Sequence, residues 1–411
     1  MAAAARSAVV VVVDRLGAGW LGPYGNTWLD TPDFNRLAAQ SILCETVIAD
    51  TPDLAGSYRA HWAGRHAMAP DQEGQPTLAE FAARAGARTV LVSDERQVMD
   101  HPLARGFGER RILPEVSAAK SAETIEQTGL FSLFKSARKA IEQQTRPFLL
   151  WIHARGMSGP WDAPLELRYQ FADEEDPEPP SFVEPPNVML SEDFDPDKLL
   201  GYVHAYAGQV ALADMCLEIL LDSIDEHPLQ DETVLVVTSP RGFPLGEHRR
   251  VGPCDDALYG ELLHVPLFIR FPKQLHALTR IGQVTQPAEV YSLVGEACGW
   301  LNFGEKQTSA IMSELSGELL RGINVACAVG AEQRAIRTPA WFLREQSTGD
   351  GLQRELFAKP DDRWEANEVS SRCGDIVELL AGELDRFQAA VREGRLSESP
   401  PLAELLCDVW R

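Results

Sequence analysis

Short runs of apolar residues, each bounded by turn-forming residues, alternate along the chain with segments of helical periodicity. The apolar runs predict strands, because a strand buried on both faces of a parallel sheet is apolar at nearly every position. The predicted strands are Val9–Val13, Thr89–Val92, Pro147–His153, Val234–Thr238 and Val265–Phe271. The predicted helices are Phe34–Gln40, Thr77–Ala85, Ser132–Gln144, Tyr206–Asp225 and Ala288–Cys298. This alternation is typical of an α/β protein with a largely parallel central sheet flanked by helices.

Two regions depart from this pattern. Residues Gln170–Asp197 are acidic, rich in proline and poorly periodic, which predicts an extended surface loop. Beyond about Gln307, the pattern predicts short antiparallel strands and one amphipathic helix, at Val325–Gly330, Ala335–Thr338, Ala340–Arg344 and Ile376–Val391. We therefore expect an α/β domain over residues 1–306 and a small antiparallel α+β subdomain over residues 307–411.

The composition narrows the class of partner. A formal net charge of −23 argues against nucleic acid and against anionic membranes as partners, because both are polyanions. The apolar run of Met1–Val13 ends in a charged residue and a glycine-rich turn, so we read it as a buried strand rather than a signal peptide. The seven cysteines show no C-x-x-C spacing that would indicate a zinc site. These features predict a soluble, cytoplasmic protein.

Polar residues follow several of the predicted strands. Asp14, Asp94, His153 and the Ser239–Arg241 loop all lie at, or directly after, the end of a strand. Functional sites of parallel sheets form at the carboxyl ends of the strands, so we expect these residues to converge there.

Several segments of the chain carry a family resemblance. The first strand and turn read V-V-V-V-V-D-R-L-G-A-G-W-L-G-P-Y-G, and the following helix begins T-P-D-F-N-R-L-A-A-Q. Further segments read H-V-P-L-F-I-R-F-P and, near the end, R-E-L-F-A-K-P-D-D-R-W-E-A-N-E-V. In this order, and over nearly all the chain, they resemble the sulfatase branch of the alkaline phosphatase superfamily. The resemblance implies a two-domain α/β fold with a small C-terminal antiparallel subdomain.

The resemblance also implies a chemistry. In that family a cysteine or serine, matured to formylglycine, attacks the sulfur of a sulfate ester. A calcium ion held mainly by carboxylates neutralises the sulfate oxygens, and basic side chains complete the pocket.

The matching positions of this chain depart from the family's pattern. The nucleophile position falls on Leu54, and the arginine of the same motif falls on Tyr58, with Arg59 next to it. The family's lysine falls on Asp94, and its two histidines fall on His153 and Ser158.

The metal ligands differ as well. The second aspartate after the first strand is Arg15, and the two late ligands are Pro240 and Arg241, so that only Asp14 is retained. A divalent ion about 4 Å from one guanidinium would be repelled by roughly 8 kcal/mol at an effective dielectric constant near 20. The sequence therefore predicts a protein without calcium, without formylglycine and without any other cofactor.

Two interpretations of Arg15 and Arg241 stay open. The two guanidinium groups can fill the vacated ion site and pair with Asp14 and Asp94 as a salt-bridge cluster. Alternatively, they can line a pocket for a small anion, such as sulfate, phosphate or a carboxylate.

Another nucleophile is conceivable at Ser57, with His61, His66, His153 or His248 as the base. In the family, however, the positions of Ser57 and His248 belong to the framework. We therefore favour a pseudoenzyme that has lost ester hydrolysis. The alternatives are an active sulfate or phosphate ester hydrolase with a rearranged site, and a structural protein that binds a partner through Gln170–Asp197. The residues expected in the degenerate pocket are Asp14, Arg15, Leu54, Ser57, Arg59, Asp94, His153, Arg241 and His248.

Overall fold

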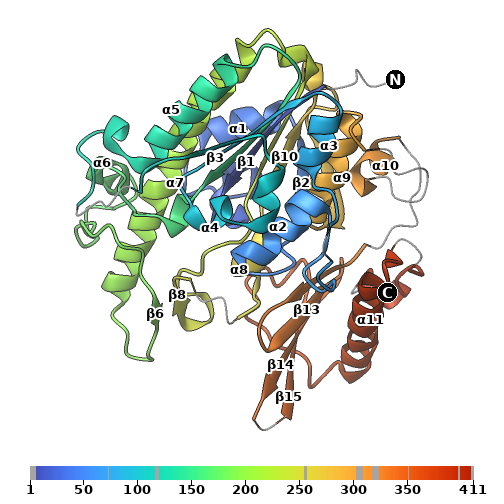
Figure 1. The fold of residues 1–411 in the computed structure, drawn as a ribbon. Helices are drawn as coiled ribbons and strands as arrows, with labels where there is room; N and C mark the ends of the chain where they lie inside the picture. The colour runs from blue at the N-terminus through green and yellow to red at the C-terminus, as the bar shows by residue number, and fades with distance from the viewer. Residues whose placement is uncertain are drawn as a thin grey trace.

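The computed structural model describes residues 6–72, 74–115, 120–253, 257–301, 309–316, 324–349, 351–396 and 399–408. A central sheet carries the N-terminal part of the chain, in the order β11-β2-β10-β7-β1-β5-β3-β4, with β9 paired to β2 (Figure 1). Its strands are β1 (Ser7–Val13), β2 (Ile42–Ile48), β3 (Arg88–Ser93), β4 (Glu109–Ile112), β5 (Phe148–Ala154), β7 (Thr233–Thr238), β9 (His264–Val265), β10 (Leu267–Arg270) and β11 (Thr279–Thr285).

The middle of the sheet is parallel, as the sequence predicts. Strand β1 pairs in parallel with β5 and with β7, and β3 pairs in parallel with β5 and with β4. The predicted strand Val265–Phe271 is wrong in detail, because it is divided into β9 and β10, which pair antiparallel with their neighbours. The sheet is therefore mixed, although mostly parallel.

Helices cover both faces of the sheet, as Figure 1 shows. On one face lie α1 (Pro32–Ala39), α5 (Gly129–Glu142) and α7 (Pro196–Asp225), which pack on Val9, Val11 and Val13 of β1. The opposite face is covered by α2 (Leu54–Ala63), α3 (Leu78–Arg84) and α9 (Ala288–Ala297), against the alternate residues Val10 and Val12. The valine run of β1, Val9–Val13, is thus buried on both sides, which explains its unbroken apolar pattern.

The C-terminal part forms a second, antiparallel sheet with the order β12-β13-β14-β15. Its elements are β12 (Ala326–Val329), β13 (Gln333–Arg337), β14 (Trp341–Thr348), β15 (Gly351–Ala358) and the helix α11 (Gly374–Glu393). Helix α11 buries one apolar stripe, including Leu380, Leu384 and Phe387, against this sheet. The antiparallel subdomain expected from the sequence is therefore present.

The acidic segment Gln170–Asp197 has little regular structure, and only its last two residues belong to helix α7, whose start was predicted too late. Helix α7 begins at Pro196, ten residues before the predicted start at Tyr206, with the side chain of Asp195 as its N-cap. Within the segment, β6 (Val188–Met189) pairs antiparallel with β8 (Arg250–Val251). The remaining short helices are α4 (Arg96–Met99), α6 (Leu165–Tyr169), α8 (Gly260–Leu263) and α10 (Ala310–Ser316).

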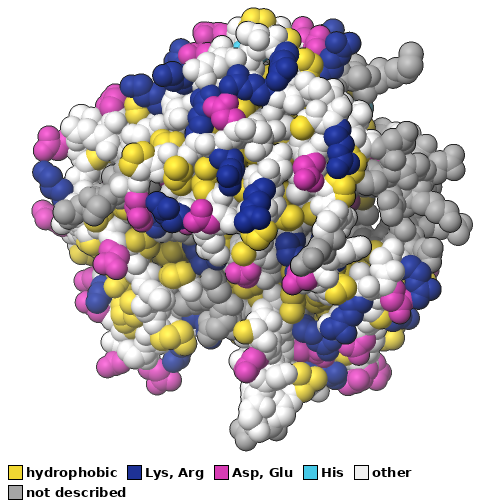
Figure 2. Space-filling model, viewed as in Figure 1, with side chains coloured by type: hydrophobic (Ala, Val, Ile, Leu, Met, Phe, Trp, Pro, Cys, Tyr) yellow, Lys and Arg dark blue, Asp and Glu magenta, His cyan; other side chains and the backbone are white. Residues whose placement is uncertain are grey.

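The surface carries charges of both signs. On the face shown in Figure 2, lysine and arginine side chains lie among the acidic ones and among apolar groups, without a single large patch of one sign. Among the described residues, no helix combines the length and apolar character needed to cross a membrane.

Candidate functional site

The carboxyl ends of the parallel strands bring together two residues that lie 227 positions apart in the chain. Asp14 follows β1, and Arg241 lies in the loop after β7, the parallel neighbour of β1. The Nε atom of Arg241 donates to Oδ1 of Asp14, and its Nη2 donates to Oδ2, both at 3.0 Å. This two-point geometry is the strong form of an arginine–carboxylate pair.

The remaining hydrogen-bonding capacity of the pair is also used within the protein. Ser158 Oγ donates to Oδ2 of Asp14 at 2.7 Å, and Nη1 of Arg241 donates to the carbonyl of Pro52 at 2.7 Å. The side chain of Asp14 is 2% exposed and that of Arg241 is 11% exposed. Burial alone would raise the pKa of Asp14, but the charge and hydrogen bonds of Arg241, with Arg15 nearby, lower it to about 2. Asp14 is therefore an ionised carboxylate that Arg241 neutralises.

Arg15 lies next to this pair, directly after Asp14 in the chain. Its backbone has a φ of 61°, a left-handed conformation that is uncommon for a residue other than glycine. Tyr206 Oη donates to the carbonyl of Arg15 at 2.7 Å, and Nη1 of Arg15 donates to the carbonyl of Gly242 at 3.4 Å. The guanidinium of Arg15 thus contributes positive charge near Asp14 while it contacts the loop that carries Arg241.

The nucleophile position lies at the first residue of α2. Asp53 caps this helix by accepting a hydrogen bond from the backbone N–H of Gly56 at 2.6 Å, and Gly64 ends it in a left-handed conformation. The side chain of Leu54 is 3% exposed and packs in the apolar cluster beside β1. This position offers a hydrocarbon side chain, without a group that could attack an ester.

His153 lies at the same end of the sheet, in an aromatic cluster. Its Nδ1 is 2.6 Å from Tyr58 Oη, on the helix turn that follows Leu54. Its Nε2 is buried and has no hydrogen-bond partner within the described part of the chain. Burial is the main reason that the pKa of His153 is lowered to about 4. The imidazole is therefore neutral at pH 7.

Asp94 does not join the Asp14–Arg241 pair. Its Oδ1 accepts the backbone N–H of Arg155 at 2.8 Å, and its side chain lines a separate small cavity of about 180 Å³. Burial raises the pKa of Asp94 to about 6. Of the two carboxylates proposed for the salt-bridge cluster, only Asp14 accepts hydrogen bonds from Arg241.

Ser57 and Arg59, which also lie on α2, make contacts directed elsewhere. Ser57 Oγ donates to the carbonyl of Leu54 at 2.8 Å, within the helix. Arg59 donates to the carbonyl of Ala69 at 2.6 Å and pairs with the exposed Asp71 at 3.1 Å. Both contacts stabilise the helix and the loop after it.

His248 lies at the junction with the C-terminal subdomain. Its Nδ1 is 2.9 Å from Glu261 Oε1, its Nε2 is 3.1 Å from the carbonyl of Glu365, and its ring stacks on Tyr259 with centroids 3.5 Å apart. Although burial alone would lower the pKa of His248, the hydrogen bond and charge of Glu261 raise it. His248 therefore connects two parts of the chain beside a large cavity.

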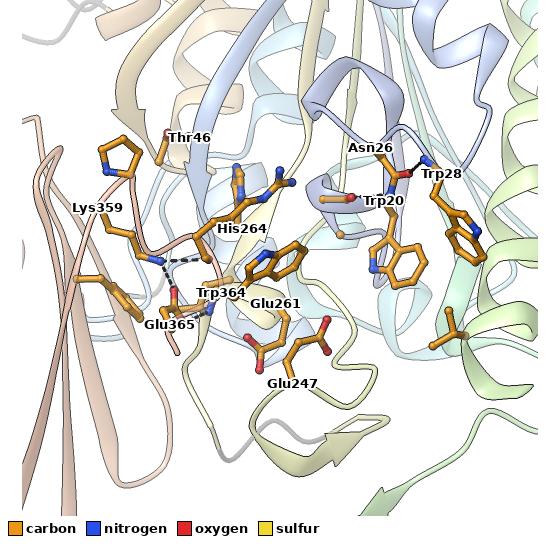
Figure 3. Close-up of a pocket in the computed structure, with 18 of the residues that line it drawn as sticks. Trp20, Asn26, Trp28, Thr46, Glu247, Glu261, His264, Lys359, Trp364 and Glu365 are labelled. Carbon is orange, nitrogen blue, oxygen red and sulfur yellow. Dashed lines mark hydrogen bonds and ion pairs between the residues drawn. The ribbon is translucent and has the colours of Figure 1, made fainter. Parts of the chain in front are cut away.

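That cavity, of about 660 Å³, is the feature that the sequence did not reveal (Figure 3). It lies between the α/β domain and the C-terminal subdomain, and its wall includes tryptophans and carboxylates from segments far apart in the sequence. The aromatic and charged residues of this wall include Trp20, Trp28, Phe171, Asp173, Asp176, His204, Glu247, Glu261, Arg337, Lys359, Arg363, Trp364 and Glu365. The sequence signal that could have pointed to it is the pair of tryptophans, Trp20 and Trp28, in and just after the first glycine-rich turn.

The cavity and the strand-end pair meet at Gly242. The backbone N–H of Gly242 donates to the carbonyl of Leu262 at 2.7 Å. A Cβ atom at Gly242 would lie 2.1 Å from the carbonyl oxygen of Glu261, so only glycine fits between these two segments. The loop that carries Arg241 is thus in direct backbone contact with the helix that carries Glu261.

The donor set that the described residues offer at the strand ends does not fit a calcium ion. Calcium takes six to eight oxygen ligands, and both oxygens of Asp14 are already held by a guanidinium. Among the described residues, no group of three or more His, Cys, Asp or Glu side chains is arranged to hold a metal ion.

Comparison with known proteins identifies the family. The sulfatase family model matches residues 6–302, which is most of the chain, so the protein belongs to the sulfatase family. No curated protein sequence matches the chain.

Solved structures share the fold at low sequence identity. The phosphonate monoester hydrolase of Agrobacterium radiobacter is 16% identical, with a TM-score of 0.74 over 94% of this chain and 96% of its own. A putative sulfatase from Bacteroides thetaiotaomicron is 15% identical, with a TM-score of 0.74 over 97% of both chains. A protein solved with its substrate D-glucosamine-2-N,6-O-disulfate is 15% identical, with a TM-score of 0.73 over 97% of this chain and 99% of its own.

Proposed function

We propose that this member of the sulfatase family has lost ester hydrolysis and acts as a non-catalytic binding protein. The observation that carries the proposal is the two-point ion pair between Asp14 and Arg241, at 3.0 Å for both contacts. An arginine here provides inside the protein the positive charge that the family takes from calcium. The carboxylate retained from the metal site is thereby neutralised without a metal.

The surroundings of the pair support the same proposal. Leu54 at the nucleophile position has no heteroatom and is buried in the apolar core. Ser57 supplies the serine hydroxyl of the same helix, but its donated hydrogen bond goes to the carbonyl of Leu54. His153 is neutral, and its Nδ1 is occupied by Tyr58. An ester hydrolase requires a nucleophile, a base and a cation at one point. These three groups are therefore not assembled here.

We further propose that Arg241 and Arg15 serve the structure rather than bind a small anion. An incoming sulfate, phosphate or carboxylate would have to displace Asp14 from Arg241. It would leave the Asp14 carboxylate buried without its partner, which is strongly unfavourable. The salt-bridge interpretation is therefore favoured over the anion pocket.

Turnover assays test the proposal directly. We expect no hydrolysis of an aryl sulfate, an aryl phosphate or an aryl phosphonate monoester above the uncatalysed background, with or without added calcium. The control pair is Ser57→Ala and Ser132→Ala, since each serine bonds a carbonyl of its own helix region. Turnover that persists in Ser132→Ala and is abolished in Ser57→Ala would overturn the proposal, as would stoichiometric calcium in the purified protein.

A further inference from the structure

The cavity of about 660 Å³ differs in chemistry from the anion pocket that the family resemblance leads one to expect. On the side of the α/β domain, its wall consists of aromatic rings and carboxylates. Trp28 lies 6.3 Å from Trp20 and 5.2 Å from Phe171, measured between ring centroids, and it stacks on His204 at 6.3 Å. These rings form one continuous aromatic wall.

Part of this wall is exposed to solvent. Trp28 is 46% exposed, and Trp364 on the opposite side of the cavity is 61% exposed. Figure 3 shows Trp20 and Trp28 on one side and Trp364 on the other, with Glu247 and Glu261 between them. Large aromatic side chains that stay exposed around a cavity are typical of a binding surface.

The carboxylates on this wall have little positive charge to balance them. Glu247 accepts a hydrogen bond from the backbone N–H of Leu245 at 2.6 Å, and within the described residues it forms no ion pair with lysine or arginine. Glu261 pairs with His248 at 2.9 Å, and Asp176 lies 3.7 Å from His204. Burial, followed by the negative charge of Glu261, raises the pKa of Glu247.

The cations that line the other side of the cavity already have partners. Lys359 Nζ pairs with Glu365 at 2.9 Å, and both side chains are less than a tenth exposed. The guanidinium of Arg363 lies over the ring of Trp364 at 5.1 Å, and Arg337 donates to backbone carbonyls of the turn before β14. Among the described residues, the negative charge of the cavity therefore lies on the side of the aromatic wall itself, where Asp173, Asp176, Glu247 and Glu261 line it.

We propose that this cavity binds an organic ammonium ion, with its cationic group held between the Trp20–Trp28 wall and the carboxylates of Glu247 and Glu261. Tryptophan faces attract cations through their quadrupole, and an ammonium group is attracted by the neighbouring carboxylates at the same time. The cavity has the volume of a small-molecule site. This ligand class is opposite in charge to the sulfate and phosphate esters of the family chemistry.

A matched pair of ligands tests the proposal. Choline and 3,3-dimethylbutan-1-ol have nearly the same shape, but only choline carries a charge. We expect saturable binding of choline to the intact protein by calorimetric titration, with a change in tryptophan fluorescence. The neutral alcohol should bind at least about tenfold more weakly, because it lacks the cation–π and carboxylate attraction.

Matched variants locate the site. Glu247→Gln and Trp28→Leu should each weaken choline binding by about fivefold or more, since each removes one of the two attractions. Glu142→Gln makes the same change in charge at an exposed position on α5 and should leave binding unchanged.

The outcomes that overturn the proposal are distinct from those that overturn the loss of hydrolysis. Equal binding of choline and its neutral isostere would show that charge is not recognised. Absence of saturable binding by choline or spermidine up to about 10 mM, or binding of sulfate or glucose at this cavity instead, would equally reject an ammonium site. None of these results would restore turnover of an ester, so the two proposals fail separately.

Discussion

The strand-end site and the large cavity differ in whether their carboxylates are balanced by positive charge within the protein. At the strand ends, the carboxylate of Asp14 is held by Arg241 and Ser158 inside the protein. In the cavity, Glu247 and Glu261 face a space of about 660 Å³ beside tryptophans that are open to solvent. A charge balanced within the fold contributes to stability, whereas a charge left facing a cavity is available to a ligand.

Under the function proposed above for the strand-end site, this difference means that a fold can lose one site while another surface stays open. Loss of calcium would leave Asp14 buried and charged, and the arginine after β7 balances that charge at the same place. The cavity, by contrast, is built at a junction between two subdomains, where packing leaves room for a ligand.

The largest effect is expected from Arg241→Met, which removes the partner of a buried carboxylate. The free energy of unfolding should fall by about 3–5 kcal/mol, measured by denaturant unfolding at pH 7. Adding Asp14→Asn to the Arg241→Met variant should restore part of this loss of stability, because it removes the uncompensated charge. Arg59→Met is the matched control, since Arg59 pairs with a carboxylate that is 91% exposed, and should change stability by less than about 1 kcal/mol. Equal losses of stability in the two arginine variants would mean that the buried pair contributes no more than the exposed one.

A smaller effect is expected from acid. The pKa of His153 is lowered to about 4 in the folded protein, mainly by burial, so the folded state binds fewer protons than the unfolded state below pH 6.5. The stability due to neutral His153 is complete above pH 6.5 and is lost as the pH falls toward 4. This loss amounts to roughly 3 kcal/mol.

The measurement compares unfolding of the wild type and of His153→Gln at several values between pH 7 and pH 4. The difference in the free energy of unfolding should shrink as the pH falls, because only the wild type has this proton to take up. His276→Gln, at an exposed position, should follow the wild type throughout. A constant difference across the range would mean that His153 is not held neutral by burial.

The smallest effect is expected from Glu247→Gln. Removing this charge should change the free energy of unfolding by less than about 1 kcal/mol, because in the described part of the chain Glu247 forms no ion pair with lysine or arginine. Thermal unfolding without ligand is the appropriate measurement. A loss as large as that of Arg241→Met would show that Glu247 supports the fold, and that the two regions do not differ as described.

The sequence predicted the strands that carry the strand-end site because their burial leaves a clear pattern. β1, β5 and β7 are buried at every position and read as unbroken apolar runs. β2 was missed, since Glu45 and the exposed middle of the strand interrupt its pattern. Helix α2 was missed as well, because its glycine and mixed aromatic residues give no regular apolar stripe.

Part of the site could be predicted for a topological reason. Asp14 and Arg241 follow adjacent parallel strands, so strand ends alone bring them close. The partner of Asp94 could not be predicted, because its hydrogen bond comes from the backbone of Arg155 and not from a charged side chain. The cavity could not be predicted from the sequence. Its wall joins the turn after β1 with residues near 171, 204, 247 and 364, which only the folded chain brings together.

Gly242 places the strand-end site and the wall of the cavity in direct backbone contact. Because a single missing methyl group lets the Arg241 loop touch the backbone of Glu261, neither segment can shift without displacing the other. If the proposed ligand displaces Glu261, the carbon resonance of the buried Asp14 carboxylate should change as well, although Asp14 does not line the cavity.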